Sequence, residues 1–202
     1  MRFKTVELPF YVYIGEGVLS KLDKILQSLE VQSFILLTDS IVYDLAAKNV
    51  EEKLKTRPRA ILVFNTVRGA LEFYQFLKQK GLDKKRPILL LHSQFTESDR
   101  ENKLKELDSV IKDNRGYIVI ATQVIEAGID ISSNIFITQL APANSLIQRL
   151  GRFLRTSEKE DERGYAVIWY ESDEKGNIIE YVYDLDLVMK TKSILEKDDN
   201  IE

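Results

Sequence analysis

The chain has 202 residues, of which 44% are hydrophobic, and a formal net charge of −3 at pH 7. It can therefore bury a core as one domain, or as one domain with an appendage. The absence of cysteine excludes disulfides and thiol-ligated zinc and favours the cytoplasm, and a single histidine excludes a multi-histidine metal site. No apolar run is long enough to span a membrane. Because the charge balance is slightly acidic, any contact with nucleic acid must be local.

Short apolar runs typical of β-strands alternate with helical patterns along the chain. Strands are expected at residues 11–15, 33–39, 60–64, 87–92, 117–121, 135–140, 165–170 and 178–183. Helices are expected at residues 18–29, 41–54, 68–80, 96–113, 144–152 and 185–196, and Thr96 and Asp99 have the spacing of a capping box. This alternation predicts an α/β fold with a mostly parallel sheet and helices on both faces.

Polar segments follow four of the expected strands from residue 60 onward. They are NTVRGA (65–70), HSQF (92–95), TQVIEAGIDIS (122–132) and APANS (141–145), which leads into QRLGRFLR (148–155). Taken alone, an arginine cluster is more typical of a solvated helix face, and a histidine at a strand end is more typical of a packed structural residue. Four such segments, each after a strand of one sheet, indicate a binding site instead, because ligands of open α/β sheets bind at the carboxyl ends of the strands.

The sequences of these segments resemble the second RecA-like lobe of superfamily-two helicases. Within that superfamily they are most similar to the CRISPR-associated helicase-nuclease family. VFNTVRGA resembles motif IV, ATQVIEAGIDIS motif V and QRLGRFLR motif VI, and the resemblance extends over residues 60–196. It implies a RecA-like, P-loop NTPase-like three-layer sandwich. One departure is Leu154, which stands where many relatives have glycine.

In these helicases, motif VI arginines reach the γ-phosphate of ATP held by the first lobe, and the resemblance assigns this catalytic role to Arg152 and Arg155. A planar, permanently charged guanidinium suits the role because it stabilises the charge spread over the transferring phosphoryl oxygens. The residues implied to lie on the nucleotide side are Gly128 and Asp130 in motif V and Gln148 and Arg149 in motif VI, the last two by orienting the motif VI helix and its neighbouring loop. Asp130 either meets the ribose or its bound water, or tethers motif VI.

The resemblance also implies a track for a nucleic-acid strand. Thr122 is the expected phosphate contact, because its short hydroxyl lies beside backbone N–H groups, and Asn65, Thr66 and Ser93 are further candidates. The expected partners are a first helicase lobe or helicase partner chain, single-stranded nucleic acid and a CRISPR effector complex, with no membrane.

Two parts of an ATPase site are missing from the sequence. It contains no G-x-x-x-x-G-K-[ST] phosphate loop, and no acidic box for Mg²⁺ follows an expected strand. The resemblance places both in the first lobe. We therefore expect ATP and Mg²⁺ to bind only when such a lobe is paired with this one, and we expect no hydrolysis by this chain alone.

Residues 1–57 resemble a different family, the amino-terminal β-α-β-α segment of the iron-containing alcohol dehydrogenase and glycerol-1-phosphate dehydrogenase group. Asp39 stands where an acidic residue can meet an adenosine ribose. The later Gly-rich loop and metal ligands of that group are missing, and GEG (15–17) is more typical of a turn. The chain is thus expected to divide into residues 1–57 and 58–202. An inactive chimera, natural or engineered, and a dinucleotide-binding module remain as alternatives, and whether both parts share one sheet is open.

Overall fold

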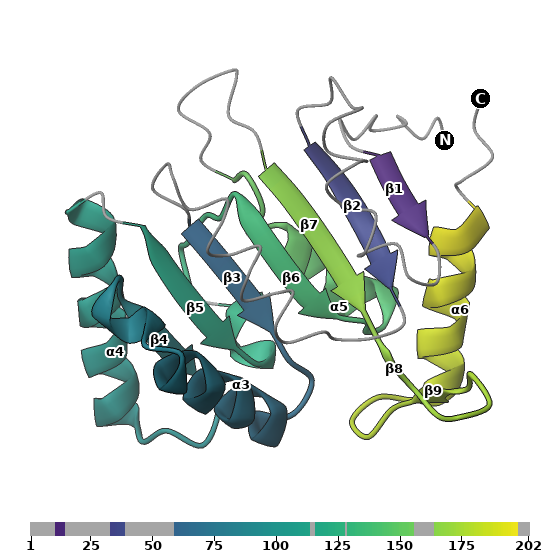
Figure 1. Cartoon of the computed structure of the whole chain (residues 1–202), viewed down its shortest axis with the longest axis horizontal. Coiled ribbons are helices and arrows are strands. Elements are labelled where there is room, and N and C mark those ends of the chain that lie inside the picture. Colours follow the sequence, from purple (N-terminus) through teal and green to yellow (C-terminus); the bar gives the residue numbers. More distant parts are fainter. Residues whose placement is uncertain are drawn as a thin grey trace.

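The structure is a computed structural model that describes residues 11–14, 33–38, 59–113, 116–127, 129–155 and 164–197. Its main element is a parallel sheet of seven strands in the order β1-β2-β7-β6-β3-β5-β4 (Figure 1). The strands are β1 (Tyr11–Ile14), β2 (Ser33–Thr38), β3 (Arg59–Val63), β4 (Ile88–Leu91), β5 (Tyr117–Ala121), β6 (Ile135–Gln139) and β7 (Gly164–Trp169). Each begins and ends within one residue of its expected range, because every run is apolar and punctuated by turn residues.

Helices connect the strands from residue 67 onward. They are α3 (Val67–Gln79), α4 (Glu97–Lys112), α5 (Ala143–Leu150) and α6 (Leu185–Lys197), with short 3₁₀ helices η3 (Leu82–Lys84) and η4 (Gln123–Glu126). The Thr96 side chain caps α4, as its spacing predicts: Thr96 Oγ1 accepts the Asp99 N–H at 3.1 Å and donates to Asp99 Oδ2 at 2.6 Å. The helices expected at 18–29 and 41–54 lie outside the described residues.

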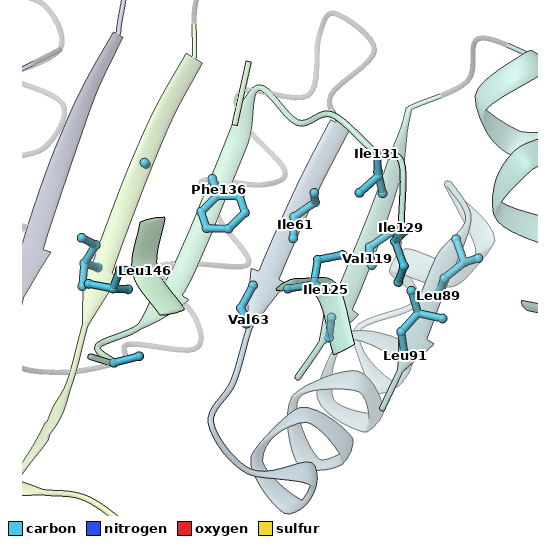
Figure 2. Packing of buried hydrophobic residues seen from close by; sticks show 14 of the residues in the cluster. Ile61, Val63, Leu89, Leu91, Val119, Ile125, Ile129, Ile131, Phe136 and Leu146 are labelled. Atoms are coloured by element: carbon cyan, nitrogen blue, oxygen red, sulfur yellow. The ribbon is translucent and has the colours of Figure 1, made fainter. Parts of the chain in front are cut away.

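One face of the sheet is covered by α4, α5 and α6. Ile61 and Val63 of β3 belong to a buried cluster that includes Leu107 of α4, Leu146 of α5 and Val188 of α6. Figure 2 shows the strand side chains of this cluster side by side.

The opposite face of the sheet is covered by α3 and η3. Leu62 alternates with Ile61 and Val63 and points to this side, where it packs in a second cluster with Phe73 of α3 and Leu82 of η3. Helices on both faces of a parallel sheet confirm the predicted architecture.

The amino-terminal segment adds two strands to the same sheet. β2 pairs with β7 in parallel from Ser33↔Gly164 to Thr38↔Trp169, and β1 pairs with β2. The question left open by the sequence is answered at this point, because the strand next to β7 comes from the part of the chain that resembles a dehydrogenase.

The strand expected at 178–183 is mostly replaced by a turn. β9 contains only Ile178–Ile179 and pairs antiparallel with β8 (Glu171–Ser172). The reason is Glu180, whose Oε1 accepts the backbone N–H groups of Tyr181, Val182 and Tyr183 at 3.0, 2.7 and 3.1 Å. A side chain that bonds three successive N–H groups removes them from any strand ladder.

Deletion of residues 1–57 should lower the unfolding midpoint or cause aggregation, because it would turn β7 into an open edge strand. Deletion of residues 1–32 is the matched control, since it removes β1 but leaves β2 paired with β7, and it should have a smaller effect. Thermal unfolding and size-exclusion chromatography measure both. A soluble 58–202 fragment with an unchanged midpoint would contradict the prediction.

Candidate functional site

The candidate site lies along the edge of the sheet where the strands end. β6, β3, β5 and β4 are consecutive neighbours and parallel, so the loops that follow them meet at one edge. Asn65 follows β3, Ser93 follows β4, Thr122 follows β5, and α5 follows β6. The topology therefore brings together the four polar segments that the sequence singles out.

The side chains predicted to contact nucleic acid differ in exposure. Ser93 is exposed and Thr66 is half-buried, whereas Asn65 and Thr122 are 3% and 1% exposed. Thr66 also caps α3, since its Oγ1 accepts the Gly69 N–H at 3.1 Å. Ser93 is the most open member of this set, and a nucleic-acid contact by any of them stays a prediction.

Arg149 is the best-connected side chain of the site. It is fully buried near the end of α5, where the resemblance implies a residue that orients this helix and its neighbouring loop. A buried charge costs several kcal/mol unless its hydrogen bonds are satisfied. Arg149 Nε donates to Glu126 Oε1 at 2.9 Å, Nη1 donates to Asn65 Oδ1, Thr138 Oγ1 and Gln139 O at 3.0–3.1 Å, and Nη2 donates to Tyr183 Oη at 2.9 Å.

Asn65 joins motif IV to this network. Its Nδ2 donates to Leu140 O at 2.8 Å and to Glu180 Oε2 at 3.0 Å, while its Oδ1 accepts from Arg149. Its backbone carbonyl accepts from Gln123 Nε2 of motif V at 2.8 Å. Every polar atom of the Asn65 side chain thus has a partner within the protein, which gives the residue a structural role in addition to the predicted contact.

Arg152 lies just beyond α5 and is half-buried. Its Nε donates to Ile125 O at 3.3 Å, and its Nη2 is 3.5 Å from Glu126 O. Burial, together with the positive charge of Arg155, lowers the pKa of Arg152. The guanidinium is therefore held on motif V by neutral carbonyl groups, which leave its charge uncompensated at this contact.

Arg155 is held differently. Its Nη1 forms an ion pair with Asp130 Oδ1 at 3.2 Å, and the two side chains are 44% and 85% exposed. This contact agrees with the tethering role considered for Asp130. Gln148 is exposed on α5, and Gly128 lies outside the described residues.

The turn between the two arginines is fixed to the loop before β6. Ser133 N donates to Arg152 O at 2.8 Å, and Leu154 N donates to Ser133 O at 2.7 Å. Leu154 has φ 51°, a left-handed conformation that favours glycine. The departure from glycine seen in the sequence therefore falls on a strained position.

His92 belongs to a stack after β4. Its ring lies parallel to that of Phe95 with centroids 3.9 Å apart, and Lys103 Nζ is 4.6 Å from the Phe95 centroid. His92 Nδ1 accepts the Gln94 N–H at 3.2 Å. Burial and the nearby Lys103 charge lower the pKa of His92, so the neutral ring is favoured.

Three site residues were missed from the sequence: Glu126, Glu180 and Tyr183. Leu146 and Arg149 are three residues apart on a helix, so an arginine on the apolar face was a detectable signal that a buried carboxylate partner was needed. No comparable signal marks Glu180 or Tyr183, which approach from the far side of a hairpin.

Two negative findings concern the described residues only. Among them, no group of three or more histidine, cysteine, aspartate or glutamate side chains is arranged to hold a metal ion. None of the helices in this part of the chain has the length and apolarity needed to cross a membrane.

The parallel sheet, with the segments that resemble motifs IV, V and VI joined at the ends of its strands, has the fold of a RecA-like helicase lobe. A family model described as CRISPR-associated nuclease/helicase Cas3, C-terminal, matches residues 56–158. The chain belongs to this family.

Known relatives agree with the assignment. The chain is 31% identical over 160 residues to the CRISPR-associated nuclease/helicase Cas3 of Methanothermobacter thermautotrophicus, a match that covers 78% of this chain and 18% of the relative. It is similar to the crystal structure of T. fusca Cas3 with a TM-score of 0.71 and 21% identity, over 86% of this chain and 22% of that one. The chain thus spans about a fifth of the length of these relatives.

A second relative belongs to the dehydrogenase group. The chain is 58% identical to the glycerol-1-phosphate dehydrogenase [NAD(P)+] of Archaeoglobus fulgidus over 55 residues, which are 27% of this chain and 16% of the dehydrogenase. The helicase family match begins at residue 56 and does not cover the residues before it.

Replacement of Arg149 by Met should destabilise the fold by about 3–5 kcal/mol, because it leaves the Glu126 carboxylate, 14% exposed, without its buried partner. The same replacement at Arg155 is the matched control, and it should cost less than about 1 kcal/mol because that ion pair is exposed. Urea unfolding of both variants measures the difference, and equal losses would rule out Arg149 as the anchor.

The single histidine should titrate below its ordinary pKa of about 6.5. Since the unfolded state binds the proton more readily, His92 contributes stability that is complete above about pH 6.5 and is lost as the pH falls towards the folded-state pKa. Lys103→Gln should raise the His92 pKa by removing a like charge, whereas Lys105→Gln, at an exposed position of the same helix, should not. NMR titration of the imidazole protons tests this, and an unshifted pKa in the Lys103 variant would disprove the coupling.

Proposed function

We propose that this chain acts as the second lobe of an ATP-dependent nucleic-acid helicase of CRISPR antiviral defence. In this proposal a first lobe binds ATP and Mg²⁺, and this lobe supplies the arginine pair Arg152 and Arg155. The observation that carries the proposal is the placement of both guanidinium groups just beyond α5, on a turn anchored to motif V and to Ser133.

The electrostatics of the pair support this role. The Asp130–Arg155 ion pair is solvent-exposed and therefore weak, so Arg155 loses little free energy when it leaves Asp130 to bind another anion. Arg152 is bound to carbonyl oxygens and remains a net cation. Two guanidinium groups that keep their charge on one turn suit the stabilisation of a transferring phosphoryl group.

The relatives add support for the ligands. The similar structures include T. fusca Cas3-ATP and a CRISPR RNA-guided surveillance complex. By this likeness we assign ATP as the substrate of the two-lobed assembly and a CRISPR effector complex as its partner. Ser93, Thr66, Thr122 and Asn65 are proposed to line or support the path of a single strand, with Ser93 as the direct contact because it is exposed.

The division of the chain belongs to the same proposal. We assign residues 58–202 to the helicase lobe and residues 1–57 to a dehydrogenase-derived segment that completes the sheet beside β7. Asp39 and the GEG turn, on which a dinucleotide site would depend, lie outside the described residues.

The proposal is tested by supplying the missing half of the site. A helicase first lobe that carries a phosphate loop, added in trans or fused, should restore nucleic-acid-stimulated ATP hydrolysis, whereas this chain alone should show none. Arg155→Lys should then reduce the rate by on the order of 10³–10⁵, because an ammonium lacks the planar fork of donors. Phosphate release with and without single-stranded DNA is the measurement.

Arg68→Lys provides the matched control, since Arg68 is an exposed residue of α3, which covers the opposite face of the sheet from α5, and its ion pair is with Glu72. It should leave the rate almost unchanged. Undiminished hydrolysis after replacement of both Arg152 and Arg155 would refute the proposal. The arginine cluster would then be an ordinary solvated helix face.

A further inference from the structure

The turn formed by residues 180–183 reaches the centre of the site from outside the family match, which ends at residue 158. It connects β9 to α6 and contacts both Asn65 of motif IV and Arg149 of motif VI. It lies outside motifs IV, V and VI. We propose that Glu180 and Tyr183 are positioning residues for the motif VI arginines, and this inference rests on the proposed function above.

Glu180 uses both carboxylate oxygens. Oε1 accepts the three backbone N–H groups of residues 181–183, which fixes the shape of the turn, and Oε2 accepts Asn65 Nδ2 at 3.0 Å. Asp184 continues this local order, since its Oδ1 accepts the N–H groups of Asp186 and Leu187 at the start of α6. The turn is therefore a rigid connection between α6 and Asn65.

Tyr183 completes the hydrogen bonding of Arg149. Among the described residues, its hydroxyl is the acceptor found for Arg149 Nη2, at 2.9 Å, and its ring centroid lies 5.9 Å from the guanidinium carbon. Because Arg149 is fully buried, water does not replace this acceptor when it is removed. The guanidinium must then move, or leave a donor unpaired.

A movement of Arg149 reaches the proposed catalytic arginines by a short path. Arg149 is the penultimate residue of α5, and its backbone carbonyl accepts the Arg152 N–H at 3.0 Å. Glu126 links the same two residues, because its carboxylate holds Arg149 and its backbone carbonyl holds Arg152. Glu180 and Tyr183 thus act on Arg152 through Arg149 without touching a substrate.

The test uses Tyr183→Phe in the full chain, paired with the first lobe described above. This change removes one hydroxyl and keeps the ring. Tyr181→Phe, two residues away and 74% exposed, is the matched control. At a temperature where all variants are folded, Tyr183→Phe should lower kcat roughly tenfold and leave the KM for ATP nearly unchanged, because the arginines act mainly on the transition state. Glu180→Gln replaces one acceptor oxygen with an NH2 group that faces N–H donors, and it should also lower kcat.

A second readout uses this chain alone and does not depend on ATP hydrolysis. The Nε–H signals of Arg149 and Arg152 in NMR spectra should shift in Tyr183→Phe, and the Arg149 signal should exchange faster with solvent, while Tyr181→Phe leaves both unchanged. Unmoved arginine signals overturn the inference. A lower melting temperature of Tyr183→Phe with an unaltered kcat also overturns the inference, because Tyr183 would then contribute to packing alone. If the wild-type pair is inactive while the signals shift as expected, the proposed function fails and the positioning contact stands.

Discussion

The buried guanidinium of Arg149 is the interaction on which the organisation of the site depends. A fully buried cation is tolerated only where the surrounding chain supplies acceptors in the right places, and those acceptors come here from β6, η4, the loop after β3 and the turn before α6. Segments far apart in the sequence are therefore fixed relative to one another by one side chain. The same contact fixes the end of α5, from which the remaining arginines of motif VI project.

Much of the fold followed from the sequence because hydrophobic periodicity responds to burial. Each parallel strand is apolar throughout, and each described helix has a buried stripe, so their positions were predicted closely. The exception was residues 178–183, whose isoleucines, valine and tyrosines are typical of a strand. Glu180 decides the outcome by bonding three backbone N–H groups, a local competition that no periodicity detects.

The candidate site was predictable in its position, but the burial of Arg149 and its partners were not. Three arginines at spacings of three residues look equivalent in QRLGRFLR. The resemblance separates Arg149 from the catalytic pair, but only the structure gives the physical reason. Because α5 ends at Leu150, Arg149 is still helical and is buried with Leu146, whereas Arg152 and Arg155 follow on a turn that is bonded to Ser133. Partners such as Tyr183 lie beyond a hairpin, and their approach depends on tertiary packing that sequence spacing does not encode.

The turn that carries Arg152 and Arg155 holds the first more firmly than the second. Arg152 is fixed at its side chain by motif V carbonyls and at its backbone by Ser133. Leu154 accepts a left-handed conformation that costs about 1–2 kcal/mol, a strain that persists only because the bond from its N–H to Ser133 holds the chain there. Arg155 lies beyond this last anchor, and its ion pair within the described part of the chain is the exposed one with Asp130, worth at most about 1 kcal/mol. Arg152 is thus preorganised, whereas Arg155 can turn from Asp130 towards another anion that approaches this turn.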